Sequence, residues 1–436
     1  MNNIGTVAVV GSPNVGKSTI FNRIIGHRHA IIDDQPGVTR DRIYDKASWL
    51  GVDFNIIDTG GIEIANRPFQ EQIRAQATIA IEEADVIVFV TDGKVGISKD
   101  DRIVAKMLYK SNKPIILAVN KIDNLDMIHS LGDFYALGLG EPLPVSGEHG
   151  IGIGDILDKI VNKLPKKEDK TYDDAITFSI IGRPNVGKSS LSNAILNKER
   201  VIVSNIEGTT RDSIDTRFTR DNQDYVVIDT AGLKKRGKIF ESVDKYSMLR
   251  ALGSIDRSEI VLLVLDAETG IQEQDKHIVG YAVEAKKAII IVVNKWDTVE
   301  RSQNAQSDFE KKVRKEFQFL DYAPIVFVSA KNKTKIDNIF KAINKVHLAY
   351  DSHVQTSILN DVIQDAQTMN PAPEFNKGRL RIYFANQASS QPPSFVMFVN
   401  KPKYAHFSYI RYIENRLRET FDLDGTPIEI VLREKV

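Results

Sequence analysis

The feature that most constrains this chain is a glycine-rich stretch that occurs twice. "GSPNVGKSTI" at residues 11–20 returns 171 positions later as "GRPNVGKSSL" at residues 182–191. The motifs that follow it return in the same order: "PGVTRD" (36–41) as "EGTTRD" (207–212), "IIDTGGI" (56–62) as "VIDTAGL" (227–233), "AVNKID" (118–123) as "VVNKWD" (292–297), and "PVSGEHG" (144–150) as "FVSAKNK" (327–333). So long a period indicates a duplicated domain and not a short repeat.

Each copy alternates short runs of β-branched residues with longer segments of helical periodicity. "TVAVVG", "DVIVFVTD" and "PIILAVN" in the first copy are apolar on both faces, and "TFSIIG", "EIVLLVLD" and "AIIIVVN" match them in the second. Strands of this kind are typical of a parallel sheet with helices on both faces. The predicted fold class is α/β, with two tandem copies of one domain.

The repeat stops near residue 349, and a different pattern follows. A helix, two strands, a second helix and a last strand are predicted there, which makes a small α+β domain. The polar stretch "LPKKEDKTYDDA" between the copies is typical of a linker. The predicted organisation is a first domain over 1–164, a linker over 165–175, a second domain over 176–348 and a C-terminal domain over 349–436.

Composition narrows the function. The chain carries 58 basic and 58 acidic residues and no cysteine. Disulfides, cysteine metal sites and a thiol nucleophile are therefore excluded, and a nucleic-acid surface must be local. No signal-peptide pattern opens the chain, and no apolar run approaches the ~18 residues of a membrane span. We expect a cytoplasmic protein without a membrane partner.

The repeated stretch fits G-x-x-x-x-G-K-[ST], the phosphate-binding P-loop. Its backbone N–H groups surround phosphates, Lys17 or Lys188 reaches the β- and γ-phosphates, and Ser18 or Ser189 ligates Mg²⁺. Two matches, each between a strand and a helix, exclude a chance glycine turn. The predicted phosphate-binding residues are Gly11, Ser12, Pro13, Asn14, Val15, Gly16, Lys17 and Ser18, with Gly182, Arg183, Pro184, Asn185, Val186, Gly187, Lys188 and Ser189.

A D-x-x-G motif ends the next apolar strand of each copy. Its aspartate can hold Mg²⁺ through the water shell of the ion, and its glycine leaves a backbone N–H free for the γ-phosphate. Alone the motif is an ordinary turn, but its place between a P-loop and N-K-x-D favours nucleotide binding. The residues are Asp58, Thr59, Gly60, Gly61 and Ile62, with Asp229, Thr230, Ala231, Gly232 and Leu233.

The N-K-x-D motif selects the base. Its aspartate accepts two N–H bonds from guanine, and its asparagine ties the base loop to the P-loop. Adenine offers no matching donors, and the carboxylate left unpaired supports discrimination of ~10⁴-fold. The nucleotide is therefore GTP, in two sites. The residues are Asn120, Lys121, Ile122 and Asp123 with Ser146, and Asn294, Lys295, Trp296 and Asp297 with Ser329 and Ala330.

Thr39 and Thr210 lie in the repeated "TRD" segments between the first helix and the second strand. We expect them to ligate Mg²⁺ and to sense the γ-phosphate, closing only in the triphosphate state. A mobile surface loop is compatible with that role. The predicted Mg²⁺ ligands are Ser18, Thr39, Asp58, Ser189, Thr210 and Asp229.

Two domains with "PNVGKS" loops, two "TRD" segments and a small C-terminal α+β domain resemble the Der (EngA) family of bacterial GTPases. The resemblance extends over essentially the whole chain. It implies a KH-like C-terminal domain and a role in maturing the large ribosomal subunit, with ribosomal RNA and proteins as partners of a monomer. The KH-like domain has no G-x-x-G after residue 349, so we do not expect it to hold single-stranded RNA in the usual groove.

The sequence determines the hydrolysis step less fully than it determines nucleotide binding. Many GTPases place a glutamine after D-x-x-G to orient water, whereas this chain has Ile62 and Leu233. We expect slow intrinsic hydrolysis. In related GTPases an asparagine at the position of Asn14 and Asn185 supports a K⁺ ion beside the phosphates, and an alternative role is that of a turn residue. The predicted catalytic residues are Asn14, Lys17, Thr39, Asn185, Lys188 and Thr210.

Basic residues also cluster in the second copy and in the C-terminal domain. Lys234, Lys235, Arg236 and Lys238 follow D-x-x-G in the second copy alone. This basic segment is predicted either to contact RNA or the C-terminal domain, or to be an ordinary solvated loop. Residues 377–436 hold 10 basic and 6 acidic residues. The last predicted helix carries Arg411 and Arg418, with Tyr404, Tyr409 and Tyr412 on or beside it; these side chains suit RNA contact, although the tyrosines are the more typical of a small core.

Three hypotheses follow. In the first, GTP in both domains stabilises an arrangement of the domains that binds a ribosomal precursor, and hydrolysis releases it. In the second, the GTPase serves tRNA modification or other enzymatic chemistry. In the third, the chain is a GTP-gated binding module with little hydrolysis.

Overall fold

The computed structural model describes residues 5–26, 44–61, 69–165, 175–196, 202–203, 215–228, 244–300 and 304–435. Contacts divide the chain into two compact units: Met1–Thr171 with Gly237–Arg250, built on the first copy, and Tyr172–Arg236 with Ala251–Val436, which holds most of the second copy and the C-terminal domain. Among these residues, no helix has both the length and the apolar character of a transmembrane segment.

The first copy is built on a six-stranded sheet in the order β2-β3-β1-β4-β5-β6. All neighbours are parallel except β2, which runs antiparallel to β3. The inner strands are buried on both faces, as their unbroken apolar sequences predict. The strands are β1 (Gly5–Gly11), β2 (Tyr44–Trp49), β3 (Val52–Asp58), β4 (Val86–Asp92), β5 (Ile115–Asn120) and β6 (Pro142–Pro144).

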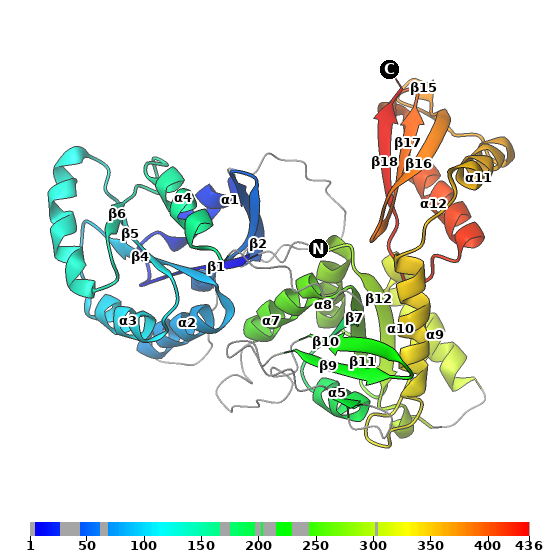
Figure 1. Cartoon of the computed structure of the whole chain (residues 1–436), viewed down its shortest axis with the longest axis horizontal. Helices are drawn as coiled ribbons and strands as arrows, with labels where there is room; N and C mark the ends of the chain where they lie inside the picture. The colour runs from blue at the N-terminus through cyan, green and yellow to red at the C-terminus, as the bar shows by residue number, and fades with distance from the viewer. Residues whose placement is uncertain are drawn as a thin grey trace. The chain divides into compact units, whose positions relative to one another are not determined.

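Helices cover both faces of this sheet, with α1 and α4 on one and α2 and α3 on the other (Figure 1). Ile20, Ile24, Ile156 and Ile160 share the core of the first face with Val9. The helices are α1 (Lys17–Gly26), α2 (Phe69–Glu83), α3 (Lys99–Lys110) and α4 (Ile153–Lys163), with 3₁₀ segments η1 (Thr59–Gly61) and η2 (Leu125–Leu137). A side-chain bond from Trp49 Nε1 to Asp158 Oδ1, 2.7 Å, joins β2 to α4.

The second copy repeats this plan in a seven-stranded sheet, β13-β12-β11-β7-β10-β9-β8. Strands β7, β10, β11, β12 and β13 are parallel, and β9 and β8 continue the sheet antiparallel. The strands are β7 (Ala175–Ile181), β8 (Ile202–Val203), β9 (Thr216–Arg220), β10 (Gln223–Val227), β11 (Ile260–Asp266), β12 (Ala288–Asn294) and β13 (Ile325–Phe327).

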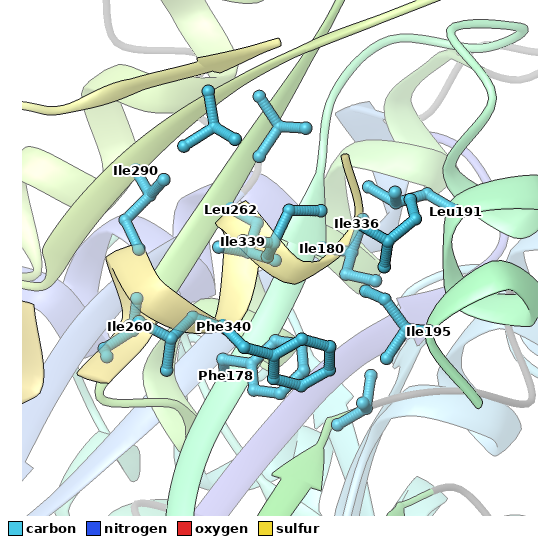
Figure 2. Packing of buried hydrophobic residues seen from close by; sticks show 14 of the residues in the cluster. Phe178, Ile180, Leu191, Ile195, Ile260, Leu262, Ile290, Ile336, Ile339 and Phe340 are labelled. Atoms are coloured by element: carbon cyan, nitrogen blue, oxygen red, sulfur yellow. The ribbon is translucent and has the colours of Figure 1, made fainter. Parts of the chain in front are cut away.

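Two cores lie on opposite faces of the second sheet. Leu191 and Ile195 of α5 and Phe340 of α10 pack on one face, in the same cluster as Phe178 and Leu262 of the strands (Figure 2). Residues of α7, α8 and α9 pack on the other. The helices are α5 (Lys188–Leu196), α7 (Asp244–Arg257), α8 (Glu273–Glu284), α9 (Ala305–Glu316) and α10 (Asp337–Tyr350), with 3₁₀ segments η3 (Trp296–Thr298) and η4 (Gln318–Leu320).

The C-terminal domain follows the predicted order of helix, two strands, helix and strand. Its sheet has the order β16-β17-β18, with β16 and β17 antiparallel and β17 and β18 parallel. Residues of α11 and α12 share one core with this sheet. The elements are α11 (Thr356–Met369), β14 (Glu374–Phe375), β15 (Gly378–Arg379), β16 (Ile382–Ser390), β17 (Pro393–Val399), η5 (Pro402–Tyr404), α12 (Phe407–Phe421) and β18 (Glu429–Glu434). The β14–β15 hairpin is an addition to the predicted plan.

The loop between α12 and β18 joins this domain to the second copy. Gly425 accepts a backbone hydrogen bond from Ile289 of β12 and donates one to Tyr322, both at 2.8 Å. Lys345 of α10 lies 2.7 Å from a carboxylate oxygen of Asp424 in the same loop. The two domains therefore share backbone hydrogen bonds as well as side-chain contacts.

Arg418 has a different role from the RNA contact considered above. Its guanidinium donates to the carbonyl oxygens of Leu423 and Thr426, at 3.0 and 2.8 Å, and lies 4.4 Å from the centre of the Tyr322 ring. These contacts hold the guanidinium within the second unit, which favours packing over RNA contact for Arg418. Arg411 remains largely exposed.

The three tyrosines on or beside α12 pack in the core of the C-terminal domain, which was the alternative interpretation. Tyr409 is buried, and Tyr404 and Tyr412 pack against the same cluster. The hydroxyl of Tyr412 donates to the carbonyl oxygen of Ala366, at 3.1 Å. The positions of Tyr409 and Tyr412 on α12 therefore reflect packing against α11.

Candidate nucleotide-binding sites

The two P-loops occupy equivalent places in their sheets. Residues 11–18 lead from β1 into α1, and residues 182–189 lead from β7 into α5. Strand β1 lies between β3 and β4, and β7 lies between β10 and β11. Parallel strands bring the loops that follow them to one edge of the sheet, which is where open α/β sheets bind ligands. The P-loop, D-x-x-G and N-K-x-D of the first copy meet at this edge.

Lys17 folds back over its own loop. Its ammonium donates to the carbonyl oxygens of Gly11 and Ser12, both at 2.9 Å. Burial lowers the pKa of Lys17, and the carboxylates of Asp58 and Asp101 oppose that shift. The ammonium is held inside the loop, where phosphate oxygens can replace the two carbonyl oxygens as partners.

Lys188 has the same conformation in the second copy. Its ammonium donates to the carbonyl oxygens of Gly182, at 2.6 Å, and Arg183, at 2.8 Å. The two P-loops therefore present their lysines alike, although the residue after the first glycine differs.

Two residues of each P-loop have a left-handed backbone. Asn14 and Gly16 have φ of 63° and 93°, and Asn185 and Gly187 have φ of 66° and 96°. Asparagine tolerates this conformation better than most side chains. Both asparagine side chains are exposed at the mouth of the loop. The turn role considered for them is thus present, and their amide oxygens stay accessible to a ligand.

The asparagine of N-K-x-D ties the base loop to the P-loop, as expected. Asn120 donates from Nδ2 to the carbonyl oxygen of Val15, at 2.7 Å, and its Oδ1 accepts from the backbone of Gly147, at 2.9 Å. A Cβ at Gly16 would lie 2.2 Å from Nδ2 of Asn120. The glycine is therefore required both by its φ and by this close approach.

The second copy makes the same tie. Asn294 donates to the carbonyl oxygen of Val186, at 2.9 Å, and accepts from the backbone of Ala330, at 3.0 Å. The backbone amide of position 147 or 330 makes this bond, so a glycine in the first copy and an alanine in the second serve equally.

Two predicted Mg²⁺ ligands of the first copy lie together. The hydroxyl of Ser18 donates to Oδ2 of Asp58, at 2.7 Å, and the backbone of Gly60 donates to Oδ1, at 2.8 Å. A hydroxyl and a carboxylate are hard oxygen donors of the kind that Mg²⁺ prefers. The residues present therefore fit the ion. Thr59, beside them, is buried and donates to the carbonyl oxygen of Val9.

Several predicted site residues lie outside the described part of the chain. They are Thr39 and Ile62 in the first copy, and Thr210, Asp229, Thr230, Ala231, Gly232 and Leu233 in the second, together with the basic run Lys234, Lys235, Arg236 and Lys238. Gly61 ends the short segment η1. The geometry of the γ-phosphate side is thus described for the first copy only as far as Gly61.

The lysine of N-K-x-D is held by an aspartate that lies outside the predicted motifs. Lys121 lies 2.6 Å from Asp92 Oδ2, and Lys295 lies 2.6 Å from Asp266 Oδ2. Burial alone would raise the pKa of Asp92, but hydrogen bonds from Lys121 and from backbone N–H groups lower it overall. The aspartate ends an apolar strand in both copies, within "TDGKVG" and "LDAETG". That repeated D-x-x-x-G was the available signal.

The base-reading aspartates differ between the copies. Asp123 accepts a hydrogen bond from the Ser146 hydroxyl on Oδ1, at 2.8 Å, and Lys94 lies 2.6 Å from Oδ2. Asp297 is exposed and has no hydrogen bond or ion pair with any described residue. Its neighbour Trp296 packs on the ring of Phe327, with centroids 4.4 Å apart.

The remaining residues of the two base loops support these positions. Ile122 is buried and donates from its backbone to Val145, at 3.0 Å, and Trp296 makes the equivalent bond to Val328, at 3.1 Å. Ser329 is buried, and its hydroxyl accepts from the backbone of Asn332. Both base loops are therefore anchored by the residue that precedes the S-G or S-A segment.

In each copy, the residue after the first glycine of the P-loop contacts an aspartate at the start of a helix. In the first copy the Ser12 hydroxyl donates to Oδ1 of Asp101, at 2.7 Å. In the second, Arg183 takes the place of the serine, and its Nε lies 3.3 Å from Oδ2 of Asp275, a fully buried side chain. Asp101 and Asp275 each belong to the capping box at the start of a helix, α3 or α8.

Two family models match this chain. A family model described as 50S ribosome-binding GTPase matches residues 6–121 and 177–295, once in each copy. A second, described as KH-domain-like of EngA bacterial GTPase enzymes, C-terminal, matches residues 353–433.

Relatives named GTPase Der match at nearly full length. The protein of Listeria welshimeri is 58% identical over 430 residues, which cover 98% of this chain and 99% of the relative. That of Bacillus cytotoxicus is 58% identical over 428 residues, 98% of each chain. Among solved structures, a variant of Aquifex aeolicus Era bound to GDP and aluminium fluoride is 20% identical. It covers 60% of this chain and 94% of its own, with a TM-score of 0.31.

Proposed function

This chain belongs to the GTPase Der family, and we propose that it hydrolyses GTP at two sites to control assembly of the large ribosomal subunit. The observation that carries the proposal is that the P-loop lysine and the asparagine of N-K-x-D make the same contacts in both copies. In each copy the P-loop lysine caps two loop carbonyls, and the asparagine of N-K-x-D bonds to the P-loop.

Each copy is proposed to bind GTP through its own motifs. The P-loop backbone, with Lys17 or Lys188, contacts the phosphates, and the glycine of D-x-x-G meets the γ-phosphate. Asp123 and Asp297 read the guanine edge. Thr39 and Thr210 are proposed to sense the γ-phosphate. Asp92 and Asp266 hold the ammonium groups of Lys121 and Lys295, and the aliphatic stems of these lysines are proposed to lie against the base.

The proposed Mg²⁺ ligands are Ser18, Thr39 and Asp58 in the first site and Ser189, Thr210 and Asp229 in the second. A Mg²⁺ ion held there offsets the negative charge of the phosphates during transfer. The chain's part is to place the serine hydroxyl at the first turn of the helix and the carboxylate at the end of the neighbouring strand.

Hydrolysis is proposed to be slow and K⁺-stimulated. Ile62 and Leu233 carry no group that can hydrogen-bond to the attacking water, so orientation of that water needs another source. The exposed amide oxygens of Asn14 and Asn185 lie at the mouth of the P-loops. They are the proposed K⁺ ligands, and a cation there offsets charge that develops on the phosphates.

The ribosomal role rests on the family. The matching model is described as a 50S ribosome-binding GTPase, and we extend that property to this chain. We propose that it acts as a monomer in the cytoplasm, on the large subunit or its precursor. The proposed domains are 1–164, 176–348 and 349–436, joined by a linker over 165–175, and nucleotide state controls their arrangement.

Co-sedimentation with purified ribosomal subunits tests this function. We expect the full-length chain to sediment with the large subunit in the presence of Mg²⁺, K⁺ and a non-hydrolysable GTP analogue, and to remain in the supernatant with GDP. Binding that ignores the nucleotide, or that prefers the small subunit or tRNA, would contradict the proposal. Single-turnover hydrolysis with and without subunits separates a working GTPase from a GTP-gated binding module.

A further inference from the structure

The loop that carries Lys94 has the same backbone in both copies. In the first copy the backbone of Lys94 donates to Asp92 Oδ1, at 2.9 Å, and Gly96 donates to the carbonyl oxygen of Asp92, at 3.0 Å. In the second copy Glu268 donates to Asp266 Oδ1, at 2.9 Å, and Gly270 to the carbonyl oxygen of Asp266, at 2.9 Å. Position 94 therefore corresponds to position 268.

The side chains at this position carry opposite charges. The Lys94 ammonium lies 2.6 Å from Oδ2 of Asp123, and Ser146 occupies Oδ1. The hydrogen bond from Lys94 lowers the pKa of Asp123, and the bond from Ser146 acts in the same direction. Glu268 carries a negative charge and cannot make such a pair with a carboxylate. In the described part of the chain, Asp297 has neither partner.

Guanine needs both oxygens of the aspartate that reads it. Its N1–H and its N2 amino group each donate to one carboxylate oxygen, and in the first copy both oxygens already have donors within the chain. The Lys94 ammonium lies on one of these oxygens, so the lysine and the base compete for it, whereas Asp297 has no such competitor among the described residues.

We propose that Lys94 competes with guanine for Asp123, so that the first site binds guanine nucleotide more weakly and releases it faster than the second. This inference rests on the proposed function, since it assumes that Asp123 and Asp297 read the base. An ion pair this exposed shifts an equilibrium by up to about fivefold. The lysine also recaptures the carboxylate once the base lifts away, which favours release.

The test is the dissociation of fluorescently labelled GDP from the full-length chain. Lys188→Ala silences the second site, so that the first can be followed alone, and Lys17→Ala does the reverse. In the first background, Lys94→Met keeps an aliphatic side chain and removes the charge. We expect it to tighten GDP binding about two- to fivefold and to slow dissociation.

A matched control and a reciprocal exchange sharpen the test. Lys99→Met removes the same charge from an exposed residue nearby in the chain, and it should leave the affinity unchanged. Glu268→Lys at the second site should weaken GDP binding about two- to fivefold. Raising the salt from about 50 mM to about 500 mM screens exposed ion pairs. The difference in GDP affinity between the chain with Lys94 and the Lys94→Met variant should therefore shrink.

The outcomes are distinguishable. If neither site of the unmodified chain binds guanine nucleotide, the proposed function fails. If binding is normal but Lys94→Met leaves the affinity unchanged or weakens it, the inference alone is overturned, and a weakened affinity would mean that the lysine contacts the nucleotide. An equal effect of Lys99→Met, or no effect of Glu268→Lys, also overturns it.

Discussion

The two copies share the contacts of the P-loop lysine and of the N-K-x-D asparagine, and they differ at the base-reading aspartate and behind the P-loop. Lys17 and Lys188 cap their loops alike, and Asn120 and Asn294 bond to the P-loop alike. Behind the loop, the Ser12–Asp101 hydrogen bond of the first copy is replaced by the buried Arg183–Asp275 ion pair of the second.

The contacts behind the P-loop support the loop and do not themselves recognise the nucleotide. A hydroxyl–carboxylate bond is easily made and broken, whereas a buried carboxylate without its cation is strongly unfavourable. The second P-loop is therefore tied more firmly to α8 than the first is to α3. We expect mutations at the shared contacts to act alike in both copies, and mutations behind the loop to act differently.

The largest expected effect is the loss of a P-loop lysine. Lys17→Ala and Lys188→Ala each remove the cation at the β- and γ-phosphates, and each should lower hydrolysis at its own site by about 10²–10³-fold. Single-turnover assays of the full-length chain, with each variant alone and both together, measure this. Loss of all activity from either single variant would show that the two sites are not independent.

Arg183→Ala should destabilise the second unit by about 3 kcal/mol, because it leaves the buried Asp275 without its cation. Ser12→Ala should cost the first unit only about 1 kcal/mol. Urea unfolding of the two units can be followed separately, since the chain has two tryptophans, Trp49 in the first copy and Trp296 in the second. Each is followed alone after replacing the other with phenylalanine.

The effect of Arg183→Ala should also depend on pH. Burial raises the pKa of Asp275, and the nearby Arg183 opposes that shift. Removing the arginine raises the pKa further, so the folded state gains affinity for a proton. Stability lost at about pH 7 should therefore return in part as the pH falls to about 5. A loss that does not change with pH would mean that Asp275 stays charged without Arg183.

Replacing K⁺ by Na⁺ should lower hydrolysis about tenfold in both copies, since both carry the asparagine. Asn14→Gly and Asn185→Gly remove the amide while keeping the left-handed backbone. Each should abolish the K⁺ dependence of its own site with little change in nucleotide affinity. Equal rates in the two salts would contradict the K⁺ role.

The smallest expected effect lies where the C-terminal domain meets the second copy. Arg418→Ala removes the bonds to Leu423 and Thr426 and the contact with Tyr322, and should destabilise the second unit by about 1 kcal/mol. Arg411→Ala, which removes only a long contact to the carbonyl oxygen of Gln318, at 3.5 Å, and an exposed pair with Asp321, at 3.9 Å, is the control and should cost at most a few tenths of a kcal/mol. A shift in the unfolding followed by Trp49 would mean that the junction also supports the first unit.

The fold and the contacts of the motifs could be predicted from the sequence because they depend on local patterns. Strand periodicity predicted the sheets, and the P-loop and N-K-x-D imply their bonds by the chemistry of a few residues. Asp92, Lys94 and Arg183 were not assigned the roles described above, because their partners are chosen by the fold. Asp275 lies far along the chain from Arg183, and nothing in a single sequence pairs them.

The role of Arg418 likewise could not be decided from the sequence, because it depends on which residues the fold places around the guanidinium. A basic helix with tyrosines predicts either RNA contact or packing, and only the neighbouring loop decides between them. Because Tyr322 and the carbonyl oxygens of residues 423 and 426 surround the guanidinium, the charge serves cohesion of the second unit.

The backbone bonds of Gly425 have a consequence for the order in which the protein forms during synthesis. A chain emerges with its N-terminal part first, and domains generally fold as units as they appear. The described sheet of the first copy ends at Pro144, so it can assemble early. The amide of Ile289, in the middle of the second copy, must wait for residue 425 before it finds its partner. The second copy is therefore the part that spends longest incomplete on the translating ribosome.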